Sequence, residues 1–223
     1  MSIDIKEMTL NRRDVDAKLA SVGDYVKMDY LQACLRKNMD FDTKKFVLIK
    51  LAEIYESRRM FLEAGKLIRN AADINTTFDG KIKDFVKSAE LFIKASRYDE
   101  SDVSFGKAIA IANERQKQEI KASKKQFIKN HAQEYLKRDK RKLAMDAYEK
   151  LVTLDLTPSE KADAQKVLLD LYQKLGKVRE YGILRDAIKN PSSRINPQQS
   201  QYKKESLKPS RIFSDDDLDN LFN

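Results

Sequence analysis

The sequence predicts an all-α protein built as an array of helical hairpins. Residues 1–189 contain a single proline, Pro158, so little in this stretch interrupts a helix. A set of residue types also recurs: a small residue, an aromatic three positions later, a small residue nine further on, and an apolar residue seven after that. The first members of successive sets are 37, 43 and 37 residues apart. Self-similarity on this scale is typical of helical repeat arrays.

The members of these sets are predicted to lie where helices pack. Small residues let two helix backbones approach closely, and the aromatic side chain fills the space between successive layers. The sets are Ala52, Tyr55, Ala64 and Ala71; Ala89, Phe92, Ser101 and Ala108; Ala132, Tyr135, Ala144 and Leu151; and, less well kept, Leu169, Tyr172, Tyr181 and Ile188.

The first hairpin expected along the chain is the weakest one, with Gly23 and Asp24 at its turn. Its small positions are poorly kept, as expected for the terminal repeat of an array. Its apolar positions are Leu19, Tyr25, Met28 and Leu35.

Two well-defined hairpins follow, in which apolar residues recur at spacings of three and four, as on a helix with one buried face. The first of them is expected to turn at Arg58, Arg59 and Met60. Its stripes are Phe46, Ile49, Ala52 and Tyr55, then Phe61, Ala64, Leu67, Ile68 and Ala71; those of the second are Phe85, Ala89, Phe92 and Ile93, then Tyr98, Ser101, Phe105, Ala108 and Ile111.

The last two hairpins show the same spacing, and one of them has clear boundary signals. Thr157 is a favourable N-cap, Pro158 fits the first helical position, and Glu160 completes a capping box. Gly176 is expected to end that helix at a tight turn. The stripes are Phe127, Ile128, Ala132 and Tyr135 with Leu143, Ala147, Tyr148, Leu151 and Val152, then Val167, Leu168, Leu171 and Tyr172 with Val178, Leu184 and Ile188.

The order of small and aromatic positions resembles the tetratricopeptide-repeat family, although the spacing exceeds that family's usual repeat of about 34 residues and the proline that closes each unit is missing. The longer hairpins are also similar to the array of soluble NSF attachment proteins. The resemblance implies a right-handed α-solenoid of about four to five hairpins over residues 1–189 that binds other proteins; the alternative is an irregular helical bundle. The matching units are Ala52, Tyr55, Arg59, Phe61, Ala64, Ile68 and Ala71, then Ala89, Phe92, Ser96, Tyr98, Ser101, Phe105 and Ala108.

The C-terminal tail has a different character. Residues 190–210 are polar and contain proline, so they are predicted to form a flexible, disordered linker. Residues 211–223 are predicted to be a short amphipathic recognition motif, because Ser214 is a strong N-cap and the aspartates after it suit the first turn of a helix. Such a motif could bind a second partner, dock on the chain's own repeats, or be a frayed end. Its candidate binding residues are Ile212, Phe213, Asp215, Asp216, Asp217, Leu218, Leu221 and Phe222.

The sequence contains none of the common catalytic or metal-binding motifs, so we expect no enzyme activity, cofactor or metal. His131 is the only histidine and Cys34 the only cysteine, and both are expected to be packed structural residues. The N-terminal residues lack the apolar segment of a secretory signal, and no apolar run approaches the roughly 20 residues of a membrane span. A cytoplasmic location is therefore expected.

The net charge of +9 lies within residues 1–189, because the tail holds equal numbers of cations and acids. A basic stripe between residues 115 and 142 would attract phosphate in a salt-dependent manner. Its alternative is the solvated surface of a lysine-rich protein. The candidate nucleic-acid-binding residues are Lys117, Lys121, Lys124, Lys125, Lys129, Lys137, Arg138 and Arg141.

These observations predict a non-enzymatic adaptor or scaffold. The first helices of the hairpins are expected to form a groove for one protein partner, and the C-terminal motif to engage a second partner or to cover that groove. The alternative is an RNA- or ribosome-associated protein that uses the basic stripe. The candidate groove residues are Lys50, Glu53, Lys87, Glu90, Lys94, Lys129 and Gln133.

Overall fold

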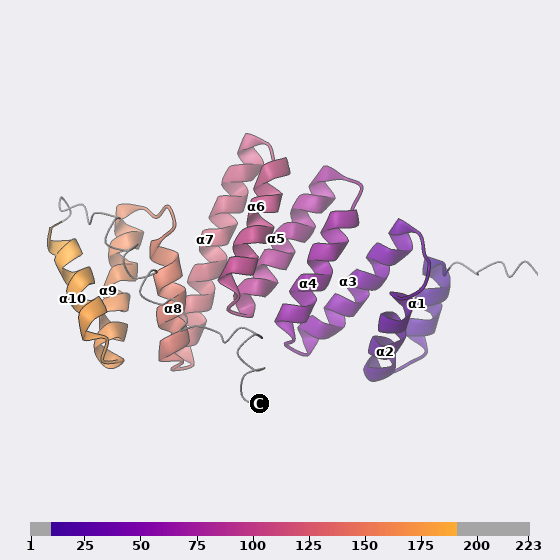
Figure 1. The fold of residues 1–223 in the computed structure, drawn as a ribbon, viewed down its shortest axis with the longest axis horizontal. Coiled ribbons are helices and arrows are strands. Elements are labelled where there is room, and N and C mark those ends of the chain that lie inside the picture. The colour runs from indigo at the N-terminus through magenta and orange to yellow at the C-terminus, as the bar shows by residue number, and fades with distance from the viewer. Residues whose placement is uncertain (1–9, 191–223) are drawn as a thin grey trace, which may run out of the picture. The chain divides into compact units, whose positions relative to one another are not determined.

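The computed structural model describes residues 10–190. Within them the chain forms ten α-helices and, apart from an isolated bridge between Leu10 and Met39, no β-structure, which confirms the predicted all-α fold (Figure 1). The C-terminal motif and nearly all of the predicted linker lie outside the described residues. The helices are α1 (Arg12–Ala20), α2 (Asp24–Cys34), α3 (Phe41–Ser57), α4 (Phe61–Ile74), α5 (Phe78–Lys94), α6 (Tyr98–Ile111), α7 (Glu114–Lys137), α8 (Arg141–Val152), α9 (Pro158–Lys174) and α10 (Val178–Lys189).

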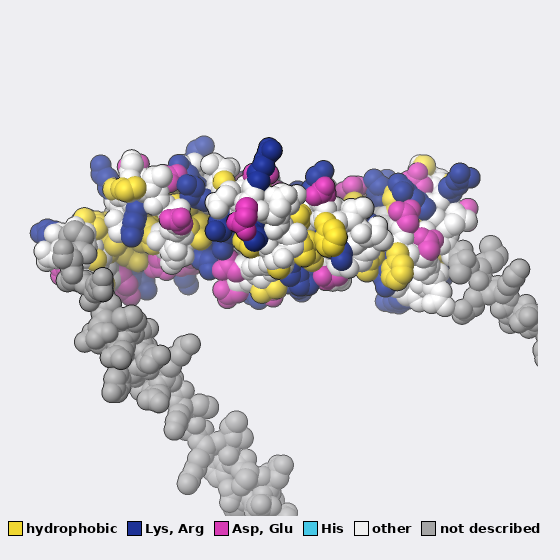
Figure 2. Space-filling model, turned by 90° about the horizontal axis from the view of Figure 1, so that it is seen from above, with side chains coloured by type: hydrophobic (Ala, Val, Ile, Leu, Met, Phe, Trp, Pro, Cys, Tyr) yellow, Lys and Arg dark blue, Asp and Glu magenta, His cyan; other side chains and the backbone are white. Residues whose placement is uncertain are grey.

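The chain divides into two compact units, and the first of them, which ends at Val178, holds helices α1 to α9. Consecutive helices of this unit pack against each other: α3 on α4, α5 on α6 and α7 on α8 form hairpins, while α4 on α5 and α8 on α9 join one hairpin to the next. The turns within the hairpins therefore lie along one edge, the lower edge in Figure 1, and the loops between hairpins lie along the other. Figure 2 views the molecule from the edge that holds the loops between hairpins, and on this edge cations and carboxylates are interspersed.

The irregular repeat spacing has a simple structural cause. Helices α3, α5 and α9 each have 17 residues, whereas α7 has 24. The additional turns lie at the N-terminal end of α7, where Asn113 and Gln116 form a capping box and the Gln116 amide donates to Asp79 of α5 at 3.0 Å. The interval of 43 residues is thus a longer first helix rather than an inserted loop.

Four hairpin turns share one backbone conformation. Arg59, Ser96, Asp139 and Gly176 have φ of +60°, +57°, +50° and +67°, and they recur at the 37, 43 and 37 spacing of the repeat. In each turn the next residue donates its N–H to the carbonyl of the repeat's aromatic residue, as from Met60 to Tyr55 at 2.8 Å, and the same bond ends at Phe92, Tyr135 and Tyr172. This is a Schellman motif, which satisfies the last carbonyls of the first helix. The aromatic position therefore fixes the turn as well as the core.

Replacing Arg59 by glycine is expected to raise the free energy of unfolding by about 0.5–1 kcal/mol, because a left-handed conformation strains a side chain but not glycine. Arg59 is exposed, so little packing is lost. Gly176→Ala should have the opposite effect by a similar amount. Urea denaturation would measure both changes, and a destabilised Arg59→Gly protein would contradict the explanation.

The core follows the repeat closely. Ala52, Ala89 and Ala132 are at most 2% exposed, and Phe92 is fully buried. Cys34 is 1% exposed, which agrees with a packed, structural cysteine.

Four residues assigned to predicted apolar positions are exposed, and one of them is Tyr25 of the first hairpin, at 76%. Leu143 lies in the first turn of α8, where the neighbouring Ala144 and Met145 occupy the buried positions, so the prediction that it faces the core is wrong. Val178 and Ile188 of α10 are also exposed, and this helix contains no buried residue.

Candidate functional site

The first helices of the hairpins share one face of the first unit. Helix α1 contacts α3, and α5 contacts α7. The Glu56 carboxylate of α3 accepts a hydrogen bond from Lys87 of α5 at 2.9 Å, and Lys125 of α7 donates to Glu160 of α9 at 3.0 Å. We call this surface of α1, α3, α5, α7 and α9 the first-helix face.

Grooves separate several of the helices on this face. The groove between α5 and α7 has a volume of about 460 Å³ and an apolar floor of Ile82, Val86 and Ile120. The groove between α7 and α9 measures about 250 Å³ and reaches down to Tyr148 and Leu151 of α8. Two further grooves border α3: one is formed with α1 and α2, and the other with α1 alone. Such open clefts with apolar floors can accept side chains of a bound polypeptide.

Most of the predicted groove residues line these clefts. Lys50 and Glu53 of α3 line the groove that α3 forms with α1 and α2, and Lys87 and Glu90 of α5 line the groove between α5 and α7. Lys129 and Gln133 border the groove between α7 and α9. The sequence prediction considered polar residues alone, so it missed the apolar floor; helical spacing of Ile82 and Val86 was the available signal.

The seventh predicted groove residue, Lys94, belongs to an ion-pair network that joins α3 to α5. Its ammonium lies 2.8 Å from Glu90 and 3.2 Å from Glu56, and Lys87 contacts the same two carboxylates. Burial alone would raise the pKa of Glu56, but the two lysines outweigh it, and the pKa lies below its usual value. Burial alone would lower the pKa of Lys94, and Glu90 and Glu56 raise it.

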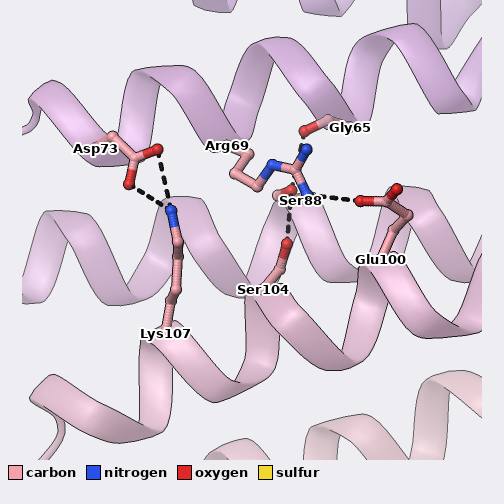
Figure 3. A network of polar contacts seen from close by, with 7 residues as sticks. All are labelled: Gly65, Arg69, Asp73, Ser88, Glu100, Ser104 and Lys107. Carbon is pink, nitrogen blue, oxygen red and sulfur yellow. Dashed lines mark hydrogen bonds and ion pairs between the residues drawn. The ribbon is translucent and has the colours of Figure 1, made fainter.

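Two ion pairs join the second helices α4 and α6 of neighbouring hairpins (Figure 3). Arg69 of α4 pairs with Glu100 of α6 at 2.7 Å, and Lys107 of α6 pairs with Asp73 of α4 at 2.8 Å. The Ser88 hydroxyl of α5 also donates a hydrogen bond to the Gly65 carbonyl of α4 at 2.9 Å.

The N-terminal part of the predicted basic stripe is largely paired with acids. Lys117 lies 2.7 Å from Glu114, and Lys125 contacts Glu160 of α9. Lys124 reaches in another direction, to Asp102 of α6 at 2.7 Å. Thus lysines adjacent in sequence are held by different neighbouring helices.

The other predicted nucleic-acid contacts are distributed between α7 and the turn after it. Arg138 pairs with Glu134, and Arg141 with Asp139. For Lys121, Lys129 and Lys137 no ion pair occurs among the residues that the structure describes. The structure therefore does not gather the predicted nucleic-acid-binding residues into one continuous unpaired surface. These residues are Lys117, Lys121, Lys124, Lys125, Lys129, Lys137, Arg138 and Arg141.

His131 is buried within α7 and packs against a neighbouring aromatic ring. It is 8% exposed, and its ring centroid lies 4.3 Å from that of Tyr135 in an edge-on arrangement. Burial lowers its pKa, so the neutral imidazole is favoured in the folded protein. Between residues 10 and 190 no three His, Cys, Asp or Glu side chains are grouped so that they could hold a metal ion. In the same residues no helix is both long and apolar enough to cross a membrane.

Comparison with known proteins adds little to this description. No family model matches the chain, and no curated protein matches it. Among solved structures, the crystal structure of BtubC (BKLC) from P. vanneervenii is 13% identical, with a TM-score of 0.34, and the alignment covers 90% of this chain and 82% of that chain. A likeness at this level carries no argument about function, and the fold class rests on the chain's own helices.

Proposed function

We propose that the protein is a non-enzymatic scaffold whose first-helix face binds a segment of another protein. The observation that carries the proposal is the series of grooves between consecutive first helices. Their apolar floors offer pockets for side chains, and the polar residues along their rims offer hydrogen bonds and charge pairing.

A lysine placed in the groove between α5 and α7 is expected to weaken partner binding by about tenfold or more, because it fills the cleft and adds a charge to its apolar floor. Val86→Lys makes this change in α5. The matched control is Val103→Lys on α6, where the valine is 53% exposed. Affinity capture from extracts of the source cells, followed by quantitative mass spectrometry, would compare the two variants with the original protein.

Thermal unfolding would first establish that both variants remain folded. Loss of the same captured proteins from Val86→Lys alone would support the first-helix face. Equal capture by Val86→Lys, Val103→Lys and the original chain would show that this groove is not the binding site.

We further propose that residues 211–223 provide a second contact, tethered through residues 190–210. The support for this comes from the sequence: large apolar residues such as Phe213 and Phe222 flank a run of aspartates, which suits folding onto a partner's groove. A chain that ends at Lys208 should capture fewer proteins than the full chain. Identical capture by both would remove this part of the proposal.

The RNA-associated alternative is the weaker candidate. Lys117, Lys124 and Lys125 are each within 3.0 Å of a carboxylate, which reduces the charge available to phosphate. The aromatic residues of the repeat pack in the core or close the hairpin turns, so they are poorly placed to stack on bases. A protein-binding role explains the grooves of the first-helix face, which RNA binding by the basic stripe does not.

A further inference from the structure

The turn between α7 and α8 is the most concentrated positive region among the described residues. Lys137, Arg138, Lys140, Arg141 and Lys142 lie within six consecutive residues, and all are exposed. Asp139 is the one carboxylate among them, and it pairs with Arg141 at 2.8 Å. Within residues 10–190 no ion pair is formed by Lys137, Lys140 or Lys142.

Helix stability explains only part of this cluster, because Lys137 and Arg138 lie at the C-terminal end of α7, where the helix dipole favours cations. Lys140 occupies the N-cap position of α8, and Arg141 and Lys142 lie in its first turn, which contains no acid. The positive end of a helix dipole disfavours cations there. The equivalent helices α4 and α6 begin with acids, Glu63 in one and Asp99 with Glu100 in the other. The cations at the start of α8 oppose the dipole of that helix, which points to a role outside folding.

Exposed aliphatic side chains accompany the cations along the same edge. Leu143 is 36% exposed beside the cluster, and Met60 is 39% exposed next to Arg59 in the turn between α3 and α4. Val178, which follows Lys177 after α9, is 79% exposed. Met60 is the N-cap residue of α4, and Leu143 and Val178 lie in the first turns of α8 and α10, so all three lie next to hairpin turns, along one edge of the first unit (Figure 1).

We propose that this edge, centred on the turn between α7 and α8, docks on an anionic lipid surface. Each lysine or arginine close to such a membrane strengthens binding by about fivefold. Aliphatic side chains inserted between headgroups add apolar burial. Nucleic acid would use the cations but gain nothing from Leu143, Met60 or Val178, since its phosphates are bound by charge and its bases by stacking. The proposal concerns an edge rather than the first-helix face, so it stands apart from the proposed function.

The full chain should co-sediment with phosphatidylcholine vesicles that contain phosphatidylserine and not with phosphatidylcholine alone. Reversing two charges, with Lys140→Glu and Lys142→Glu together, should lower the partition coefficient by about 30-fold or more, given about fivefold for each lost cation. Glutamate at a helix N-terminus is favourable, so the double variant should remain folded. The matched control is Lys44→Glu with Lys83→Glu, exposed lysines near the N-terminal ends of α3 and α5, which should bind as the original chain does.

A further variant and a second ligand separate lipid from nucleic acid. Leu143→Ser should weaken vesicle binding severalfold and leave binding to a generic RNA unchanged. The proposal is overturned if the chain fails to bind phosphatidylserine vesicles, or if both double variants bind them equally. It is also overturned if the chain binds RNA at salt concentrations that abolish vesicle binding, because the edge would then be a nucleic-acid surface.

Discussion

Replacing Phe92 by alanine is expected to lower the free energy of unfolding by about 3–5 kcal/mol. The ring is fully buried, and it lies so close to α4 that a Cβ built on Gly65 would be 3.0 Å from it. The Arg69 guanidinium also lies over this ring, 5.1 Å from its centroid. Alanine would leave a cavity between α4 and α5 that neighbouring helices can fill only in part. A loss of this size is large relative to the total stability of a typical domain, about 5–15 kcal/mol.

The matched control for this prediction is in the same helix. Phe78 is the first residue of α5 and is 71% exposed, so Phe78→Ala should change the free energy of unfolding by less than about 0.5 kcal/mol. Urea unfolding followed by circular dichroism measures both variants. Comparable losses for Phe78→Ala and Phe92→Ala would mean that the repeat's aromatic position is not a main source of stability.

The contact between Phe92 and Gly65 can be tested from its other side. Gly65→Ala should force the ring to move by a few tenths of an ångström, and we expect this overpacking to outweigh the gain in helix propensity and to destabilise the protein by about 1 kcal/mol. A smaller aliphatic residue at position 92 leaves room for the new methyl group. The cost of Gly65→Ala should thus be smaller in a Phe92→Leu background, as a double-mutant cycle would measure.

The hairpin fold was predictable because its signals are local and repeated. Tyr55 and Phe92 recur with small residues at helix contacts, and Thr157, Pro158 and Gly176 mark one helix at both ends. The sequence placed Arg59 in a turn but did not predict the left-handed conformation of Arg59 and Ser96, because neither is a residue type that favours positive φ. In the structure this conformation is accompanied by hydrogen bonds from the next residue to the backbone carbonyls of Tyr55 and Phe92.

The candidate site was harder to predict, because it depends on which side chains from different hairpins meet. Lys124 and Lys125 are neighbours in a uniformly basic stretch, yet one pairs with Asp102 of α6 and the other with Glu160 of α9. Sequence spacing placed them on one helix but could not supply those long-range acids. In the same way, Val86 reads as an ordinary core residue until α7 is seen to leave a groove beside it.

Replacing Asp102 by asparagine is expected to cost about 1–3 kcal/mol of unfolding free energy. Its carboxylate lies 2.7 Å from Lys124 of α7 and 2.6 Å from Lys150 of α8, so one acid holds two lysines from the next hairpin. Asparagine keeps the shape but leaves the two partly buried ammonium groups to repel each other. Asp73→Asn is the control, because its pair with Lys107 is about half exposed and contributes little.

The pH dependence of the Asp102 effect follows from its pKa. Burial alone would raise that pKa, but Lys124 and Lys150 outweigh it and hold it below the usual 3.8. The unfolded chain therefore binds the proton more readily, so the stabilisation is present above pH 3.8 and is lost as the pH falls through the folded-state value. The difference in stability between the original chain and Asp102→Asn should shrink over that range; a difference that stays constant would show that the ion pairs are not its source.

Asp102→Asn also separates the two uses proposed for the positive charge. It releases Lys124 and so adds unpaired charge to the α7 stripe, away from the turn that holds Lys140 and Lys142. If the stripe binds RNA, the variant should bind generic RNA several-fold more tightly at low salt, since each phosphate contact adds to a salt-dependent affinity. If the hairpin-turn edge binds lipid, phosphatidylserine vesicle binding should be unchanged. Filter binding measures the affinity for RNA, and vesicle co-sedimentation measures lipid binding on the same protein preparation. If Asp102→Asn changed vesicle binding but not RNA binding, the assignment of RNA to the stripe and of lipid to the hairpin-turn edge would be contradicted.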